Sequence, residues 1–176
     1  MACHVIKLLG LCTLLTILIE VSFACQGHKL KVHYIRNCGN VASNVIKVQE
    51  NSSLTLTNDC EIIPNACAET TGFKTALVKY QVWKNNLPIL RNEIDACETV
   101  TKVNGDIKAM LKLFGLPSKC PIDMMKKCED GSKKADMEKY KKFLSLARGG
   151  LIKVEIKIDH DNGKSCFTSE FEVVKK

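Results

Sequence analysis

The residues with the most chemical potential in this 176-residue chain are its cysteines. Ten are present, eight of them after residue 24, and no two form the C-x-x-C pair that is typical of zinc sites. In an oxidising compartment an even number of cysteines predicts a framework of disulfides, although the sequence alone leaves their pairing open. The eight are Cys25, Cys38, Cys60, Cys67, Cys97, Cys120, Cys128 and Cys166.

Histidines and carboxylates form no recognisable catalytic set. Three histidines follow residue 24, namely His28, His33 and His160. The chain lacks the signatures of α/β-hydrolases, zinc proteases and nucleotide-binding loops. A cysteine nucleophile needs a free thiolate, which disulfide formation would remove. We therefore expect a protein that is not an enzyme and needs no cofactor.

One cluster, Asp159-His160-Asp161, has the residue types of a metal site. It directly precedes Asn162-Gly163, which is a strong signal for a tight hairpin turn. Asp and Asn are favoured in turns because their side chains bond to nearby backbone, and the ligand pattern of a calcium loop, with its terminal Glu, is missing. We interpret the cluster as a turn and predict no metal site.

Lysines give the chain a formal net charge of +7 and are densest between residues 126 and 142. Nucleic-acid binding would favour arginines and aromatic residues on one face, but only three arginines follow residue 24. The lysine run is therefore interpreted either as a solvated surface or as a patch attracted to anionic lipid headgroups, at about 1 kcal/mol per lysine. No nucleic-acid partner is expected.

The first 24 residues have the features of a secretory signal peptide. Lys7 precedes an apolar run from Leu8 to Ile19, and small residues before Cys25 suit a signal peptidase. The apolar run is shorter than the roughly 20 residues that span a bilayer. We expect cleavage after Ala24 and a single disulfide-linked domain over 25–176.

The sequence therefore predicts secretion, with lysosomal delivery as an alternative destination. Asn51-Ser52-Ser53 is an N-glycosylation sequon, which is consistent with a surface loop of a secreted protein. Glycosylation is predicted at Asn51.

Alternation of apolar and polar residues is the main signal for secondary structure. In residues 151–158, LIKVEIKI, the apolar side chains recur at every second position, as in a strand with one buried face. The same pattern appears in residues 29–35, 53–57, 73–84 and 165–174. Several short strands separated by turns predict a mainly β, two-sheet antiparallel sandwich.

Two segments have apolar residues at helical spacing instead. They cover residues 100–115 and 135–150, and glycines stand at the end of each. The sequence therefore predicts one or two short helices inserted before the C-terminal hairpin.

Four motifs, in order, resemble the ganglioside-activator and ML (lipid-recognition) family of β-sandwich proteins. They are NCGNV at 37–41, DCEIIPNAC at 59–67, GLPSKCPI at 115–122 and the C-terminal hairpin GGLIKVEIKIDHDNGKSCFTSEFEV at 149–173. The similarity extends over about residues 30–174. The chain departs from the family pattern at 133–147, where these residues have a helical pattern in place of extended chain.

This resemblance implies a cup of two antiparallel sheets that admits acyl chains or a sterol. It implies the disulfides Cys38–Cys166, Cys60–Cys67 and Cys97–Cys120, which leave Cys25 and Cys128 to pair with each other. The lipid would contact apolar residues of the inner face and of the cavity mouth. The inner-face residues are Val78, Tyr80, Val82, Ile152, Val154, Ile156 and Phe171, and those near the mouth are Leu113, Phe114, Phe143 and Leu146.

The expected function is that of a secreted carrier of a fatty acid, glycolipid or sterol, with an anionic membrane surface or a receptor as a further partner. Inward apolar residues also fill the core of an ordinary sandwich, so two alternatives remain. One is a chemosensory or immune recognition protein that engages a receptor. The other is a disulfide-rich inhibitor or venom component without a cavity.

Overall fold

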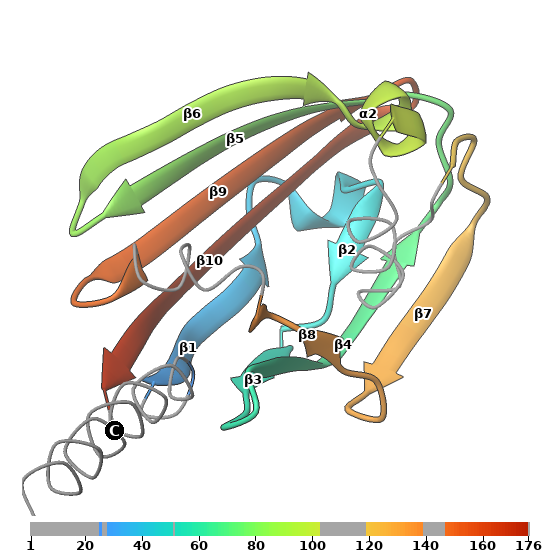
Figure 1. The fold of residues 1–176 in the computed structure, drawn as a ribbon. Coiled ribbons are helices and arrows are strands. Elements are labelled where there is room, and N and C mark those ends of the chain that lie inside the picture. Colours follow the sequence, from blue (N-terminus) through green and yellow to red (C-terminus); the bar gives the residue numbers. More distant parts are fainter. Residues whose placement is uncertain (1–24, 26–27, 51, 103–118, 139–146, 176) are drawn as a thin grey trace, which may run out of the picture.

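The computed structural model describes residues 25, 28–50, 52–102, 119–138 and 147–175 of the chain. They form two antiparallel sheets of unequal width (Figure 1), and the predicted mainly β sandwich is confirmed. The predicted signal peptide, Asn51 and the four residues assigned to the cavity mouth lie outside the described residues.

The larger sheet has the strand order β1-β10-β9-β5-β6. Its centre is the predicted C-terminal hairpin, in which β9 and β10 pair from His160↔Gly163 to Leu151↔Glu172 around a two-residue turn. A second hairpin joins β5 and β6 through Asn85 and Asn86, whose φ angles of 51° and 66° are the left-handed values of a type I′ turn. The strands are β1 (His28–Asn37), β5 (Ala76–Lys84), β6 (Leu87–Asp95), β9 (Leu151–His160) and β10 (Gly163–Lys175).

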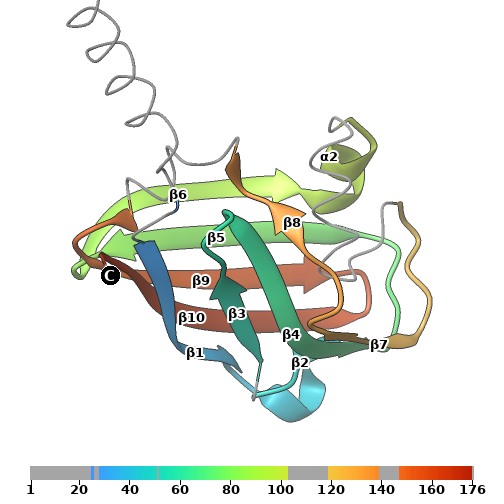
Figure 2. The same cartoon turned by 60° about the horizontal axis from the view of Figure 1, so that its bottom comes forward.

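The smaller sheet is built around β4 (Glu61–Thr70). One edge of β4 pairs with β2 (Ile46–Val48) and β3 (Ser53–Leu56), and the other with β7 (Met125–Asp130) and β8 (Ala135–Asp136). In Figure 2, β3 and β4 run across the direction of β9 and β10, so the two sheets meet at a steep angle.

The sheets come together along β1 and β10, next to β2 and β3. There the Asn37 side chain imitates a strand: its Nδ2 donates to the Val48 carbonyl at 2.7 Å, and its Oδ1 accepts from the Val48 N–H at 2.9 Å. The Cys38–Cys166 disulfide lies directly after β1, and a cluster of buried apolar residues, Cys25, Leu56 and Cys60, packs against Leu30 of β1. This side of the sandwich is closed.

Short helices complete the described part of the chain. The 3-10 turn η1 is Val41–Ser43, and α2 is Ala96–Lys102, with Asp95 Oδ1 accepting the Glu98 N–H at its start. Within the described ranges, no helix has both the length and the apolar character needed to cross a bilayer.

The sequence patterns misplaced several elements. The helix predicted from Ala135 is wrong at its start, because Ala135 and Asp136 form strand β8 opposite Ile62 and Glu61. Of the helix predicted over 100–115, the structure describes only the last residues of α2, which begins earlier at Ala96. The strands β2, β4, β6 and β7 were not predicted.

Candidate functional site

Seven of the predicted ligand residues lie on one face of the larger sheet. The register pairs Val78 with Ile158, Tyr80 with Ile156 and Val82 with Val154 across β5 and β9, and directly paired antiparallel residues project to the same face. Phe171 of β10 is opposite Ile152 in the same way. The face is directed at the smaller sheet, because Leu30 in its continuation on β1 packs against the buried cluster that contains Leu56 of β3. The seven are Val78, Tyr80, Val82, Ile152, Val154, Ile156 and Phe171.

These inward apolar residues are not packed away as a filled core would require. Of the seven, only Ile152 is buried, with 5% of its surface exposed, and the other six are half-buried. Leu90, which continues the face on β6 opposite Val82, is 51% exposed. Inner-face residues of central strands are normally buried where two sheets interdigitate. The sheets therefore leave part of the inner face accessible on the side of β5 and β6.

The opposing face, on the smaller sheet, carries charge as well as apolar surface. Along β7 the exposed residues alternate with Met125, Lys127 and Glu129, and Lys127 is paired with Ala68 on the inner side of β4. Glu129 is buried, with 6% of its surface exposed. Its Oε1 lies 2.8 Å from Lys133 Nζ and 3.7 Å from Lys127 Nζ. Two lysines thus share one carboxylate, so the trio has a formal charge of +1.

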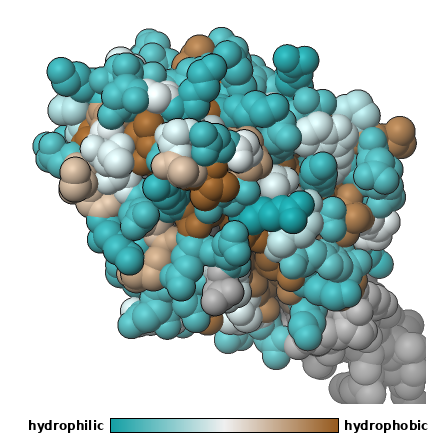
Figure 3. Space-filling view, turned by 180° about the vertical axis from the view of Figure 1, so that it is seen from behind, coloured by the Kyte–Doolittle hydropathy of each residue, from teal (hydrophilic) through white to brown (hydrophobic). Residues whose placement is uncertain are grey.

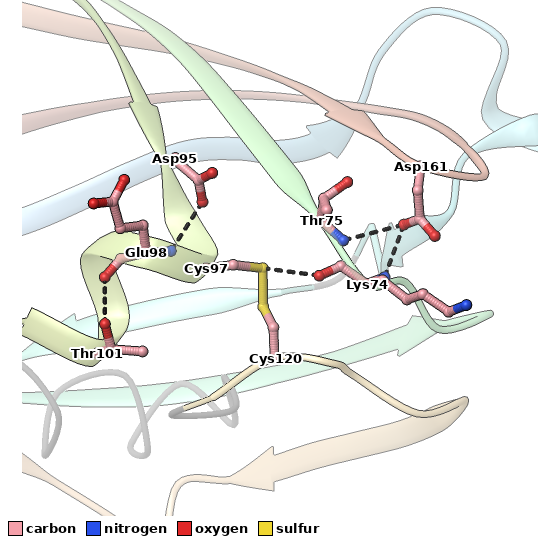
Figure 4. The surroundings of a disulfide bond; sticks show 8 residues. All are labelled: Lys74, Thr75, Asp95, Cys97, Glu98, Thr101, Cys120 and Asp161. Atoms are coloured by element: carbon pink, nitrogen blue, oxygen red, sulfur yellow. Dashed lines mark hydrogen bonds between the residues drawn. A yellow bond between two sulfur atoms is a disulfide. The ribbon is translucent and has the colours of Figure 1, made fainter.

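A disulfide joins the two sheets at one end of the accessible side, where β6 ends (Figure 4). Cys97 in α2, just after β6, is bonded to Cys120, which precedes β7. The Cys97 sulfur also lies 3.4 Å from the Lys74 carbonyl oxygen, which is a contact and not a hydrogen bond, since a bridged sulfur has no proton. The larger sheet is therefore tied to the chain entering the smaller sheet at one end of β6 and β7.

The same end of the inner face holds a half-buried histidine. His160 Nε2 lies 2.9 Å from Ser165 Oγ, which accepts the Ile46 N–H from the smaller sheet at 2.9 Å. The Phe73 ring packs on the imidazole with a centroid separation of 4.4 Å. Burial lowers the pKa of His160, and this effect outweighs the backbone of Thr75 and the neighbouring aspartates, which raise it. The lowered pKa favours the neutral imidazole, and the contacts with Ser165 and Phe73 give His160 a structural role.

The side chains of the Asp159-His160-Asp161 cluster diverge. Asp159 Oδ2 accepts from Lys79 Nζ at 2.9 Å, and this ammonium holds the pKa of the carboxyl below its usual value. Asp161 Oδ1 accepts the backbone N–H groups of Lys74 and Thr75 at 2.7 and 3.1 Å, which lowers its pKa (Figure 4). In the described part of the chain, no three His, Cys, Asp or Glu residues are grouped as metal ligands.

The structure confirms two of the disulfides that the family resemblance implied and corrects the others. Cys38–Cys166 and Cys97–Cys120 are present. The expected Cys60–Cys67 and Cys25–Cys128 pairs are wrong, and Cys25–Cys60 and Cys67–Cys128 are found instead.

The reason for the correction is the conformation of β4. Cys67 lies inside β4 and Cys60 directly precedes it. Seven residues of extended chain separate two Cα atoms by about 23 Å, whereas a disulfide needs less than about 7 Å. Cys67 instead lies directly opposite Cys128 on β7, with Cα atoms 4.0 Å apart.

Sequence patterns missed the charged trio because its members are not distinguished from the other lysines and acids around residue 130. The signal is the strand period: once β7 is recognised, Lys127 and Glu129 fall on its inner face. The predicted mouth residues Leu113, Phe114, Phe143 and Leu146 lie outside the described residues.

Comparisons with known proteins give one clear relationship. No model of a known protein family matches the chain. The Sporozoite-associated mosquito saliva protein 1 of Anopheles gambiae is 35% identical to it over 153 residues, which cover 85% of this chain and 83% of that protein. A relative from saliva and four disulfides in the structure agree with the predicted secretion. At this identity and coverage, the chain belongs to the same family as this mosquito saliva protein.

Proposed function

We propose that this secreted protein is a non-enzymatic carrier that holds the apolar part of a lipid between its two sheets. The observation that carries the proposal is the accessible inner face of the larger sheet, where six of seven aligned apolar residues are only half-buried. The resemblance to the ganglioside-activator and ML family supports it. A fatty acid, glycolipid or sterol chain on this face would gain about 0.8 kcal/mol for each CH₂ removed from water.

The charged trio gives the proposed ligand a polar end. Glu129 neutralises one of its two lysine partners, so the remaining positive charge can pair with a carboxylate or phosphate headgroup. Lys127 projects from the inner face of β7, across from the apolar face of the larger sheet. An anionic amphipathic lipid therefore fits this arrangement better than a neutral sterol does.

The test is a comparison of two tryptophan variants of neighbouring residues on β5. Val82→Trp adds bulk on the inner face, whereas Gln81→Trp adds it on the outer face, opposite Arg91. The purified proteins are examined by native mass spectrometry, by organic extraction and by displacement of a fluorescent fatty acid. We expect wild type and Gln81→Trp to bind and Val82→Trp to lose most of its uptake. A folded wild-type protein with no extractable lipid and no displacement would refute the proposal.

A second candidate is a recognition protein that associates with a cell surface. The name of the Anopheles relative describes that protein as sporozoite-associated, which is the observation that favours this candidate. Binding of the wild type and of Val82→Trp to sporozoites distinguishes the two. Equal cell binding by a variant that no longer takes up fatty acid would favour recognition, and loss of both would favour a lipid-dependent role. An inhibitor with a filled core is the least consistent with the half-buried inner face.

A further inference from the structure

Strand β6 has an open edge with exposed apolar residues. On the rear face of the molecule, hydrophobic residues reach the surface in several separate places (Figure 3). Exposed apolar residues that lie together on one strand are the better candidates for a binding surface. Leu87, Ile89 and Leu90 are 69%, 56% and 51% exposed, and all three lie on β6. Among the described residues this strand pairs only with β5. A long apolar edge strand is a template for pairing with another chain.

The two edges of the larger sheet differ in their protection. The β1 edge carries Lys29, Lys31 and Arg36 and lies against β3, which blocks the approach of another strand. The free edge of β6 instead has nine residues, with Arg91 and Glu93 two positions apart on the outer face. Opposite charges at this spacing suit antiparallel pairing with an identical strand.

Symmetry limits the registers that two β6 strands can adopt. If the outer faces of both copies remain on the same side, a two-fold axis perpendicular to the sheet lies midway between the two strands, between one residue of β6 and the same residue of the second copy. An axis at Arg91 or at Glu93 places identical charges opposite each other, which is destabilising. An axis at Asn92 pairs Arg91 with the Glu93 of the second copy, and it does so twice.

The Asn92 register also satisfies the rest of the strand. Leu90 falls opposite Ile94 of the second copy on the inner face, which covers one of the exposed apolar residues. Seven residues, 89–95, are paired in each copy. Pro88, which has no N–H to contribute to a sheet, falls outside that range.

We propose that the protein forms a two-fold symmetric homodimer through antiparallel pairing of β6, centred on Asn92, which joins two five-stranded sheets into one. The proposal does not depend on lipid carriage, because it rests on the open edge of β6 and on the charges of its outer face, and the pairing requires no bound lipid. The Glu93 side chain is 54% exposed, with Lys79 Nζ 3.8 Å from its Oε2, and so it remains reachable by an arginine of a second copy.

Cysteine cross-linking tests the register. Directly opposite antiparallel residues have Cα atoms about 4.5–5.5 Å apart, within the range that a disulfide bridges. Asn92→Cys should therefore form a covalent dimer under mild oxidation. The matched control is Leu87→Cys on the same strand, which is also an exposed position, with 69% of the Leu87 surface accessible, but lies far from its own copy in this register. Equal cross-linking of both variants would overturn the proposed pairing.

Charge exchange tests the same interface without added cysteines. Arg91→Glu and Glu93→Arg each place like charges opposite one another at two sites. We expect each to weaken the dimer about tenfold in sedimentation equilibrium, and the double variant Arg91→Glu/Glu93→Arg to restore it. A wild-type protein that stays monomeric at every attainable concentration overturns the proposal. A monomer that instead co-sediments with phosphatidylserine vesicles through Leu87 and Ile89 would assign the exposed hairpin to membranes and also overturn it.

Discussion

Replacement of Asn37 by alanine tests how the two sheets are held at their closed side. Asn37 is the last residue of β1, and its amide makes two hydrogen bonds to the backbone of Val48 on β2, at 2.7 and 2.9 Å. Val48 pairs with Ala68 on the other side, so Asn37 occupies the place of a neighbouring strand. Alanine can supply neither bond.

The expected loss follows from these two bonds. A net contribution of about 0.5–1.5 kcal/mol per hydrogen bond gives about 1–3 kcal/mol, and the upper part of the range applies where water cannot reach the groups left behind. Both bonds are half-buried, so we expect about 2 kcal/mol. For a domain of about 150 residues this corresponds to a fall in Tm of about 4–8 °C.

Urea unfolding of Asn37→Ala and wild type, followed by tryptophan fluorescence and circular dichroism, measures this change. The matched control is Asn40→Ala, because Asn40 is exposed and its side chain makes no capping bond at η1. We expect Asn40→Ala to unfold within about 0.5 kcal/mol of wild type. If both variants changed stability equally, the bridge between β1 and β2 would not be what holds the closed side.

Three further predictions concern the disulfides, the histidine and the charged trio. Non-reducing peptide mapping should find Cys67 linked to Cys128, and replacing both by alanine should cost about 2–4 kcal/mol of stability in urea; a map with Cys67 linked elsewhere would contradict the pairing. Because burial lowers the pKa of His160 below its ordinary value of 6.5, the unfolded chain binds this proton more readily, so stability should fall as the pH drops from about 7 to 5. His160→Gln should reduce that slope in urea midpoints measured across the same range, and an unchanged slope would assign it to other groups. Lys127→Met should weaken uptake of fluorescent fatty acid more than uptake of a neutral lipid probe, whereas Lys126→Met, on the exposed face of β7, should change neither.

The strands that were predicted from the sequence are those in which apolar and polar residues alternate clearly. In β9 and β10 the inner residues are mostly apolar and the outer residues are mostly charged, so both the strands and their shared face could be deduced. The seven inner-face residues were identified for the same reason. Their common orientation in the structure follows because successive side chains of a strand point to opposite faces of the sheet. A shift of one residue in register would move every side chain of the strand to the other face.

The strands that were missed lack this contrast. Nearly every residue of β6 is exposed, because the strand lies at an open edge and neither of its faces is fully covered. The β7 sequence, Met125–Asp130, is mostly charged, and its inner face buries a glutamate where an apolar residue would be expected. Strands at the rim of a sandwich are determined by pairing with residues that are distant in the sequence. The local alternation of apolar and polar residues contains no information about such pairing.

Both wrong disulfide assignments have one cause, which is that strand β4 was not predicted. Treating residues 60–67 as a small loop made a Cys60–Cys67 bridge reasonable, and it left Cys25 and Cys128 to each other. Once residues 61–70 are a strand, that bridge is too long to form, and both assignments fail together.

The open side of the sandwich links the two proposals. Leu90 and Ile94 lie on the inner face of β6, on either side of Asn92, so pairing about Asn92 would place the inner faces of the two copies side by side. Leu90 of one copy would then lie opposite Ile94 of the other beside the two Asn92 side chains, and lipid bound in one copy would reach the dimer interface. Dimerisation and lipid uptake should therefore be coupled: saturating fatty acid should shift the sedimentation equilibrium of the wild type, and it should not shift that of Val82→Trp. Because linkage is reciprocal, a dimer constant independent of lipid would mean that the bound chain does not extend to β6.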